Sequence, residues 1–151
     1  MTGYKKILVA VDLSPEAKPV VARARELGEH YGAALSLIHV VDPIITTGDY
    51  ELHPELPLEV EHTLVERARG YIGSLAKDMG IADAEQVVAI GSVKHEILAY
   101  AKEHGCDLIV IGTHGRHGIT VLLGSTANAI MHGTECDVMC VRVGDHRTAQ
   151  K

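Results

Sequence analysis

The chain has 151 residues, a length that suits one domain built around a single core. It contains no Phe or Trp, which excludes the aromatic platforms that bind single-stranded nucleic acid, and its formal net charge of −6 argues against a nucleic-acid partner. No apolar run approaches the roughly 20 residues that span a bilayer, and no cleavable signal follows the first run. We therefore expect a cytoplasmic protein with no membrane partner.

Five aliphatic stretches predict buried β-strands, because their apolar residues are nearly continuous instead of alternating. They cover residues 5–11, 33–41, 85–90, 107–112 and 137–143.

Four amphipathic stretches between these strands predict helices. The first follows Ser14, a good N-cap, and Pro15, which suits the first helical position. The others cover residues 60–75 and 93–101 and a stretch starting near Ser125. Left-handed C-caps are expected at Gly32, Gly80, Gly105 and Gly133.

Strict alternation of strands and helices predicts an α/β fold, an open parallel sheet with helices on both faces. We expect a single domain over residues 1–144 and a disordered tail over residues 145–151. The connection over residues 42–58 is unusually long and contains three prolines, so it is either a functional flap or a mobile loop.

Ligands of such sheets bind at the carboxyl ends of the strands, and two of these ends have unusual residues. Asp12 follows the first strand, where it can hold a ribose hydroxyl or a Mg²⁺ ion that bridges phosphates. The fourth strand runs into a glycine-rich stretch, GTHGRHG, followed by LLGSTAN. Glycines let backbone N–H groups approach a phosphate, and a helix N-terminus favours an anion. The polar residues Thr113, His114, Arg116, Ser125 and Thr126 add donors.

Three blocks in order, YKKILVAVDLSPEA, LSLIHVVD and DLIVIGTHGRHG…LLGSTAN, resemble the universal stress protein family over nearly the whole chain. The resemblance implies a Rossmann-like domain of the adenine nucleotide alpha hydrolase type, with strand order 3-2-1-4-5, that forms homodimers. In one branch of the family it also implies binding of ATP, and we expect ATP or AMP with Mg²⁺ as the ligand here. Carried over by position, the nucleotide contacts are Ala10, Asp12, Val40, Ile111, Gly112, Gly115, Gly124 and Ser125.

The spacing of the glycines leaves a second interpretation open. Eight residues separate Gly115 from Gly124, whereas the ATP-binding branch has nine. Eight resembles the UspA-type branch, whose classical members lack these glycines and are not thought to bind ATP. The function is therefore expected to be either that of a nucleotide-binding stress-response regulator, with slow hydrolysis at most, or that of a homodimeric interaction module without nucleotide.

Other chemistries are not supported by the sequence. A zinc site lacks a third ligand beside His114 and His117, and a flavin site lacks its phosphate loop after the first strand. A phospho-receiver domain would need an Asp after the third strand, where Gly91 and Ser92 stand. An enzyme acting on ATP could use only Asp12 or His114 as a base.

The last strand predicts the dimer interface. The segment from Asp137 to Val143 is apolar at alternating positions and lies at a sheet edge in the order 3-2-1-4-5. An apolar edge is stabilised by antiparallel pairing with its own copy across a two-fold axis. Cys136 and Cys140, by contrast, are expected to be buried and unreactive, and their four-residue spacing predicts a common face if both are extended. His39 is expected to be a hydrogen-bonded core residue.

Overall fold

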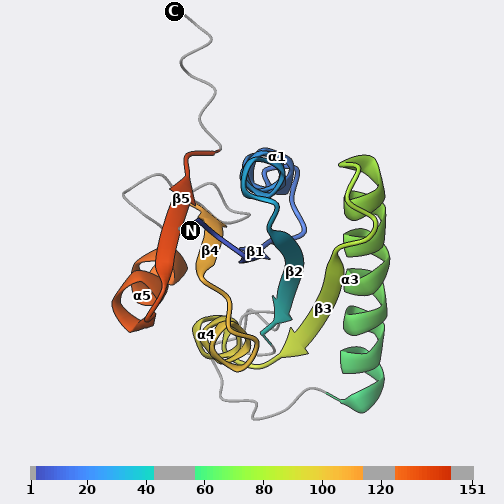
Figure 1. The fold of residues 1–151 in the computed structure, drawn as a ribbon. Helices are drawn as coiled ribbons and strands as arrows, with labels where there is room; N and C mark the ends of the chain where they lie inside the picture. The colour runs from blue at the N-terminus through green and yellow to red at the C-terminus, as the bar shows by residue number, and fades with distance from the viewer. Residues whose placement is uncertain (1–2, 43–56, 114–124, 144–151) are drawn as a thin grey trace, which may run out of the picture.

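A computed structural model describes residues 3–42, 57–113 and 125–143 of the chain (Figure 1). Strands and helices alternate along the described residues, as the sequence predicts. In chain order they are β1 (Lys6–Ala10), α1 (Ala17–Tyr31), β2 (Ala34–Val41), α3 (Leu58–Asp78), β3 (Glu85–Ile90), α4 (Val93–Glu103), β4 (Leu108–Gly112), α5 (Ser125–Gly133) and β5 (Asp137–Val141). Most of the long connection after β2 and the tail lie outside the described residues.

The five strands form one parallel sheet in the order β3-β2-β1-β4-β5, which confirms the predicted topology. Strand β1 is central: Val9 pairs with Leu37 of β2 on one side and with Val110 of β4 on the other. The chain therefore leaves β1 toward β2 and later returns to its other side at β4. The strand order reverses at this point, where ligands of such sheets bind.

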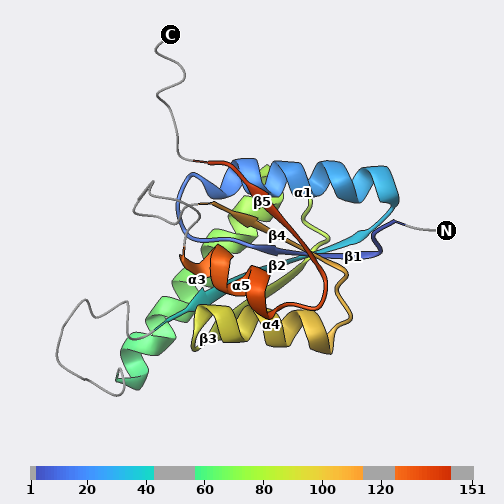
Figure 2. The same cartoon turned by 90° about the vertical axis from the view of Figure 1, so that its left-hand side faces the viewer.

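Helices cover both faces of the sheet (Figures 1 and 2). On one face α1 and α3 pack over residues such as Val9, Leu37 and Val110, and on the other α4 and α5 pack over Leu8 and Ile109. Coverage of both faces explains the unbroken aliphatic runs, because both sets of side chains along β1 and β4 are removed from water. No helix of the described residues is long and apolar enough to cross a membrane.

The start of α1 differs from the prediction. The helix begins at Ala17 after Glu16, not beside Ser14 and Pro15, and no side chain caps it. Residues 14–17 instead form a tight turn in which Ala17 N donates to Ser14 O at 3.0 Å. The Ser14 hydroxyl accepts from Glu16 N at 3.2 Å, so it caps this turn and not the helix.

Three of the four predicted glycine caps are confirmed. Gly32, Gly80 and Gly105 have positive φ angles of 69°, 74° and 67°. The prediction for Gly133 is wrong: it is the last residue of α5 and its φ is not positive. Its place reflects packing, because a Cβ there would lie 2.9 Å from Leu98 Cδ1 of α4. Glycine thus lets α5 approach α4 closely.

Candidate functional site

The predicted apolar contacts of the site lie together on the face covered by α4 and α5. Val40 and Ile111 are each 7% exposed, and the partly buried Ala10 packs against the same cluster. They come from β2, β4 and β1, and Ala10 continues the register that pairs Val9 with Val110. Strands β1, β2 and β4 thus form one apolar floor near the carboxyl edge of the sheet.

Asp12 lies at the same edge, in the connection between β1 and α1. Its Oδ1 accepts two hydrogen bonds from Ser14, one from the backbone N–H at 3.1 Å and one from the hydroxyl at 2.7 Å. Among the described residues nothing donates to Oδ2, so one carboxylate oxygen is left for a ligand. The local turn therefore orients Asp12 while leaving half of its carboxylate available to a hydroxyl or a cation.

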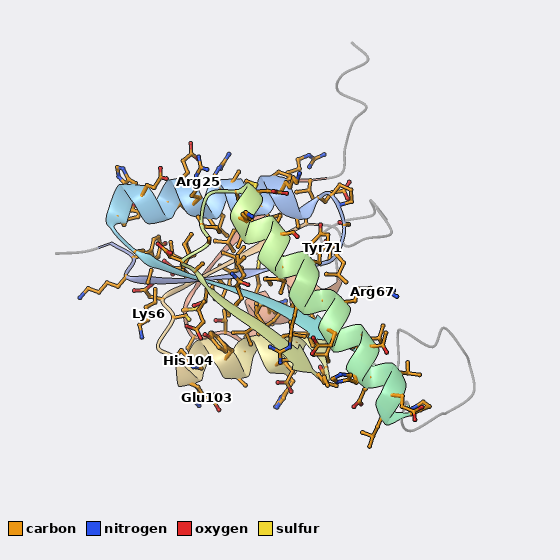
Figure 3. All side chains as sticks on the ribbon, turned by 90° about the vertical axis from the view of Figure 1, so that its right-hand side faces the viewer. Lys6, Arg25, Arg67, Tyr71, Glu103 and His104 are labelled. Carbon is orange, nitrogen blue, oxygen red and sulfur yellow. The ribbon has the colours of Figure 1, made fainter. Side chains whose placement is uncertain are left out.

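Tyr71 is a member of this site that sequence reasoning missed. It lies on α3, close to the start of α1 (Figure 3), and its hydroxyl donates to Ser14 O at 2.9 Å. Burial, together with the negative charge of Asp12, raises the pKa of Tyr71 above its ordinary value of 10.0. The contact spans 57 residues of sequence, and no local pattern announces it.

His39 supports the same edge from β2. Its Nδ1 lies 2.9 Å from Val11 O, which can only accept, so Nδ1 has the hydrogen. The predicted hydrogen bond is confirmed, although His39 is half-buried and not part of the inner core. It ties the residue before Asp12 to β2.

At the end of β4 the structure describes part of the predicted phosphate site. Gly112 ends the strand, and Thr113 N donates to Val141 O at 2.9 Å. The Thr113 hydroxyl, expected to face a phosphate, accepts instead from Val143 N at 3.3 Å. Helix α5 begins at Ser125, with Thr126 half-buried in its first turn. The predicted contacts His114, Gly115, Arg116 and Gly124 lie outside the described residues.

The remaining chemical groups are dispersed. Within residues 3–42, 57–113 and 125–143, no three His, Cys, Asp or Glu side chains gather as metal ligands. Cys106 is buried, whereas Cys136 and Cys140, which were expected to be buried, are only partly so. Burial raises the pKa of both Cys106 and Cys140. The predicted common face of Cys136 and Cys140 is confirmed, because both pack against the cluster beneath α4 and α5.

Comparison with known proteins places the chain in a family. The model of the universal stress protein family matches residues 3–142. Universal stress protein A homolog 2 of Coxiella burnetii is 43% identical over 144 residues, which cover 95% of this chain and 98% of that protein. The structure of UspA from Lactobacillus plantarum superposes with a TM-score of 0.78 at 26% identity, covering 94% of this chain and 100% of the other.

A second solved structure has the same fold with a ligand. It is a universal stress protein in complex with cAMP, which matches with a TM-score of 0.63 at 22% identity and covers 93% of this chain and 98% of that one. At that identity the likeness shows the fold alone. Together, the family match over nearly the full length, the relative at 43% identity and the shared sheet order show that the chain belongs to the universal stress protein family.

Proposed function

We propose that this universal stress protein binds an adenine nucleotide, ATP or AMP, at the carboxyl ends of β1 and β4, and that it acts as a nucleotide-responsive regulator. The observation that carries the proposal is the convergence of Ala10, Val40, Ile111 and Asp12 at the edge where the strand order reverses. An apolar floor beside an oriented carboxylate suits a flat base joined to a sugar with hydroxyls.

Different residues contact different parts of the nucleotide. The floor of Ala10, Val40 and Ile111 buries the base, and the available oxygen of Asp12 accepts from a ribose hydroxyl or helps to hold Mg²⁺. When bound, Mg²⁺ supplies neutralising charge between phosphate oxygens. The N-terminus of α5 at Ser125 and Thr126 completes an anion site together with the glycine-rich stretch before it. The cAMP complex of a protein with the same fold supports an adenine nucleotide as the ligand class.

The protein is proposed to act by binding and not by rapid catalysis. In the described part of the site, Asp12 is the candidate for a catalytic base. One oxygen of its carboxylate already accepts hydrogen bonds in the turn at Ser14. A base that activates water needs a free oxygen within about 3 Å of the attacking atom, and the same oxygen is assigned here to the ligand. We therefore expect slow hydrolysis at most.

The working form is proposed to be a homodimer that pairs through β5. That strand is at the edge of the sheet and bonds only to β4 among the described residues, and its apolar positions are half-exposed. Pairing with a second copy would satisfy the open edge under two-fold symmetry.

Titration calorimetry with ATP and Mg²⁺ on the purified protein tests the nucleotide proposal. Saturable heat that weakens when EDTA replaces Mg²⁺ is the expected result, with AMP and cAMP as matched ligands that identify the part of the nucleotide recognised. Mass spectrometry of the freshly purified, denatured protein is the second readout, because it detects nucleotide that co-purifies.

The specific alternative is a homodimeric interaction module that binds no nucleotide. The eight residues between Gly115 and Gly124 favour it, because a shift of one residue moves the backbone by about 3.8 Å. Absence of heat at millimolar ATP, together with the absence of co-purified nucleotide, would establish this alternative and end the nucleotide proposal.

A further inference from the structure

Two cysteines meet at the opposite end of the sheet from the nucleotide site. Cys106 precedes β4 and Cys136 precedes β5, and these parallel strands pair Leu108 with Asp137. Continuing this register places Cys136 across from Asp107, next to Cys106. Neighbouring strands lie about 4.8 Å apart and consecutive Cα atoms about 3.8 Å, so the Cα atoms of Cys106 and Cys136 lie within about 8.6 Å of each other. Disulfides span Cα distances of about 4.4–6.8 Å, which fall within this limit.

The two side chains lie on the same face, because Cys106 precedes β4 and does not continue the alternation of that strand. Both pack into the cluster beneath α4 and α5, and both line an open pocket of about 1080 Å³ between α4 and the turn after α5. Cys136 is held by Thr134, whose Oγ1 lies 3.2 Å from its Sγ and accepts from its backbone N–H at 3.1 Å. The pocket gives a small oxidant a route to both sulfur atoms.

Electrostatics indicates the same proximity, and the difference in exposure orders the two thiols. Burial raises the pKa of Cys106, and negative charge on Cys136 raises it further, an effect that needs the two sulfurs to be close. Cys106 is 9% exposed, whereas Cys136 is half-buried at the pocket. Since the thiolate is the nucleophile and must reach the oxidant, Cys136 is the first to react.

We propose that Cys106 and Cys136 form a dithiol site that hydroperoxides oxidise to an intramolecular disulfide. The thiolate of Cys136 attacks one oxygen of hydrogen peroxide, so an S–O bond forms, the O–O bond breaks and hydroxide leaves as water after protonation. Cys106 sulfur then attacks the sulfenic acid sulfur, an S–S bond forms, the S–O bond breaks and a second water leaves with the thiol proton. Two thiols and one hydrogen peroxide thus give one disulfide and two waters.

Cys140 is the control that the chain itself offers. It lies within β5, four residues after Cys136, so strand geometry separates their Cα atoms by about 13 Å. Its sulfur lies 3.9 Å from Met131 Sδ, and in the sheet it pairs with Ile111. The distance from Cys136 exceeds what a disulfide can span without movement of the backbone.

The test counts thiols by mass. The reduced full-length protein is treated with hydrogen peroxide, then unfolded in guanidinium with N-ethylmaleimide. We expect the maleimides bound per chain to fall from three to one, and peptide mapping to find a Cys106–Cys136 crosslink. In Cys140→Ser the number of maleimides bound per chain should fall from two to none. Cys136→Ser should form no intramolecular crosslink.

Retention of all three maleimides after treatment that oxidises a small dithiol of similar reactivity would overturn the proposal. So would a crosslink that includes Cys140 or joins two chains. The wild-type peptide map alone decides the pairing, so the conclusion does not depend on whether the serine variants fold.

Discussion

Asp12 combines a structural and a ligand-binding role in one carboxylate. Its Oδ1 holds the turn at Ser14 through two hydrogen bonds, while its Oδ2 accepts none from the described residues. An amide in place of the carboxylate keeps an oxygen for the turn but removes the negative charge that holds Mg²⁺. The two roles can therefore be separated by choosing the substitution.

Asp12→Asn is expected to weaken Mg²⁺-dependent ATP binding by tenfold or more, with the free energy of unfolding changed by less than about 0.5 kcal/mol. Asp12→Ala is the matched variant: it should weaken binding similarly and also cost about 1 kcal/mol of stability, because it leaves the Ser14 donors unpaired. Calorimetry and urea denaturation measure the two effects. Unaltered Mg²⁺ dependence in Asp12→Asn would contradict the role assigned to the charge.

Tyr71 joins α3 to the turn before α1 through its bond to Ser14 O. Tyr71→Phe should lower the free energy of unfolding by about 1 kcal/mol at neutral pH. The folded pKa of Tyr71 is raised above the unfolded value of 10.0, so its stabilising contribution is complete below that pH and is lost as pH rises through the folded pKa. Urea denaturation at pH 8 and at successive values above 10 should show the difference from wild type narrowing.

Tyr4 also titrates in this range, because its hydrogen bond to Asp137 raises its pKa. It is present in both wild type and Tyr71→Phe, so the comparison removes its contribution. A difference between the two proteins that stays constant from pH 8 upward would contradict the linkage assigned to Tyr71.

At the scale of elements, two exposed glycines separate backbone conformation from packing. A Cβ added at Gly70 or at Gly105 meets no atom within 4 Å, but Gly105 has a φ of 67° and Gly70 lies inside α3 without a positive φ. Gly105→Ala should cost about 1–2 kcal/mol, whereas Gly70→Ala should stabilise the protein by up to about 1 kcal/mol. Thermal unfolding of both variants tests this pair, and shifts of the same sign would contradict it.

Strand β5 makes a specific prediction for the proposed dimer. Val141 O accepts from Thr113 N, so the backbone of Val141 faces β4, and by alternation the N–H of Cys140 faces away from it. Cys140→Pro should therefore raise the dimer dissociation constant at least tenfold while the monomer stays folded. Val141→Pro would instead remove a donor that faces β4. Light scattering against Cys140→Ser, which keeps the N–H, is the measurement.

A wild-type monomer at micromolar concentration would remove the basis of this prediction. Equal dissociation constants for Cys140→Pro and Cys140→Ser would show that the dimer, if present, uses another surface.

At the scale of the whole molecule, the sheet was predictable because burial on both faces produces unbroken aliphatic runs in the sequence. Runs such as residues 7–9 and 108–111 announce central strands, and all five strand positions were predicted within about two residues. Contacts between distant segments produce no comparable local pattern. The bond from Tyr71 to Ser14 and the approach of Gly133 to Leu98 depend on how helices pack, which a single sequence does not encode locally.

The candidate site divides in the same way. The apolar floor was predictable because Ala10, Val40 and Ile111 end buried strands, and parallel strands bring their carboxyl ends to one edge. The geometry around Asp12 was not, because Ser14 looks like a helix cap in sequence and serves a preceding turn in the structure. Whether the Ser14 side chain caps a helix or the turn just before it depends on tertiary contacts.

The two proposed sites lie at opposite ends of the sheet. Figure 3 shows Tyr71 and Lys6 at opposite ends of the sheet. Tyr71 lies beside the nucleotide edge. Lys6 marks the other end, because its Nζ donates to His104 O, two residues before Cys106. The five residues of β4 separate these ends by about 17 Å. A packed parallel strand has a single conformation and does not switch between two states. Coupling between sites needs an element with two states that both ligands bias.

Oxidation of the Cys106–Cys136 pair is therefore expected to leave the dissociation constant for ATP within about twofold of its reduced value, below the fivefold at which allosteric coupling usually begins. By reciprocity, saturating ATP should leave the equilibrium between dithiol and disulfide equally unchanged in a glutathione buffer. Calorimetry on reduced and oxidised protein measures the first quantity and maleimide counting the second. A shift beyond fivefold in both would show that β4, or the segment between it and α5, transmits oxidation at one end of the sheet to the nucleotide at the other.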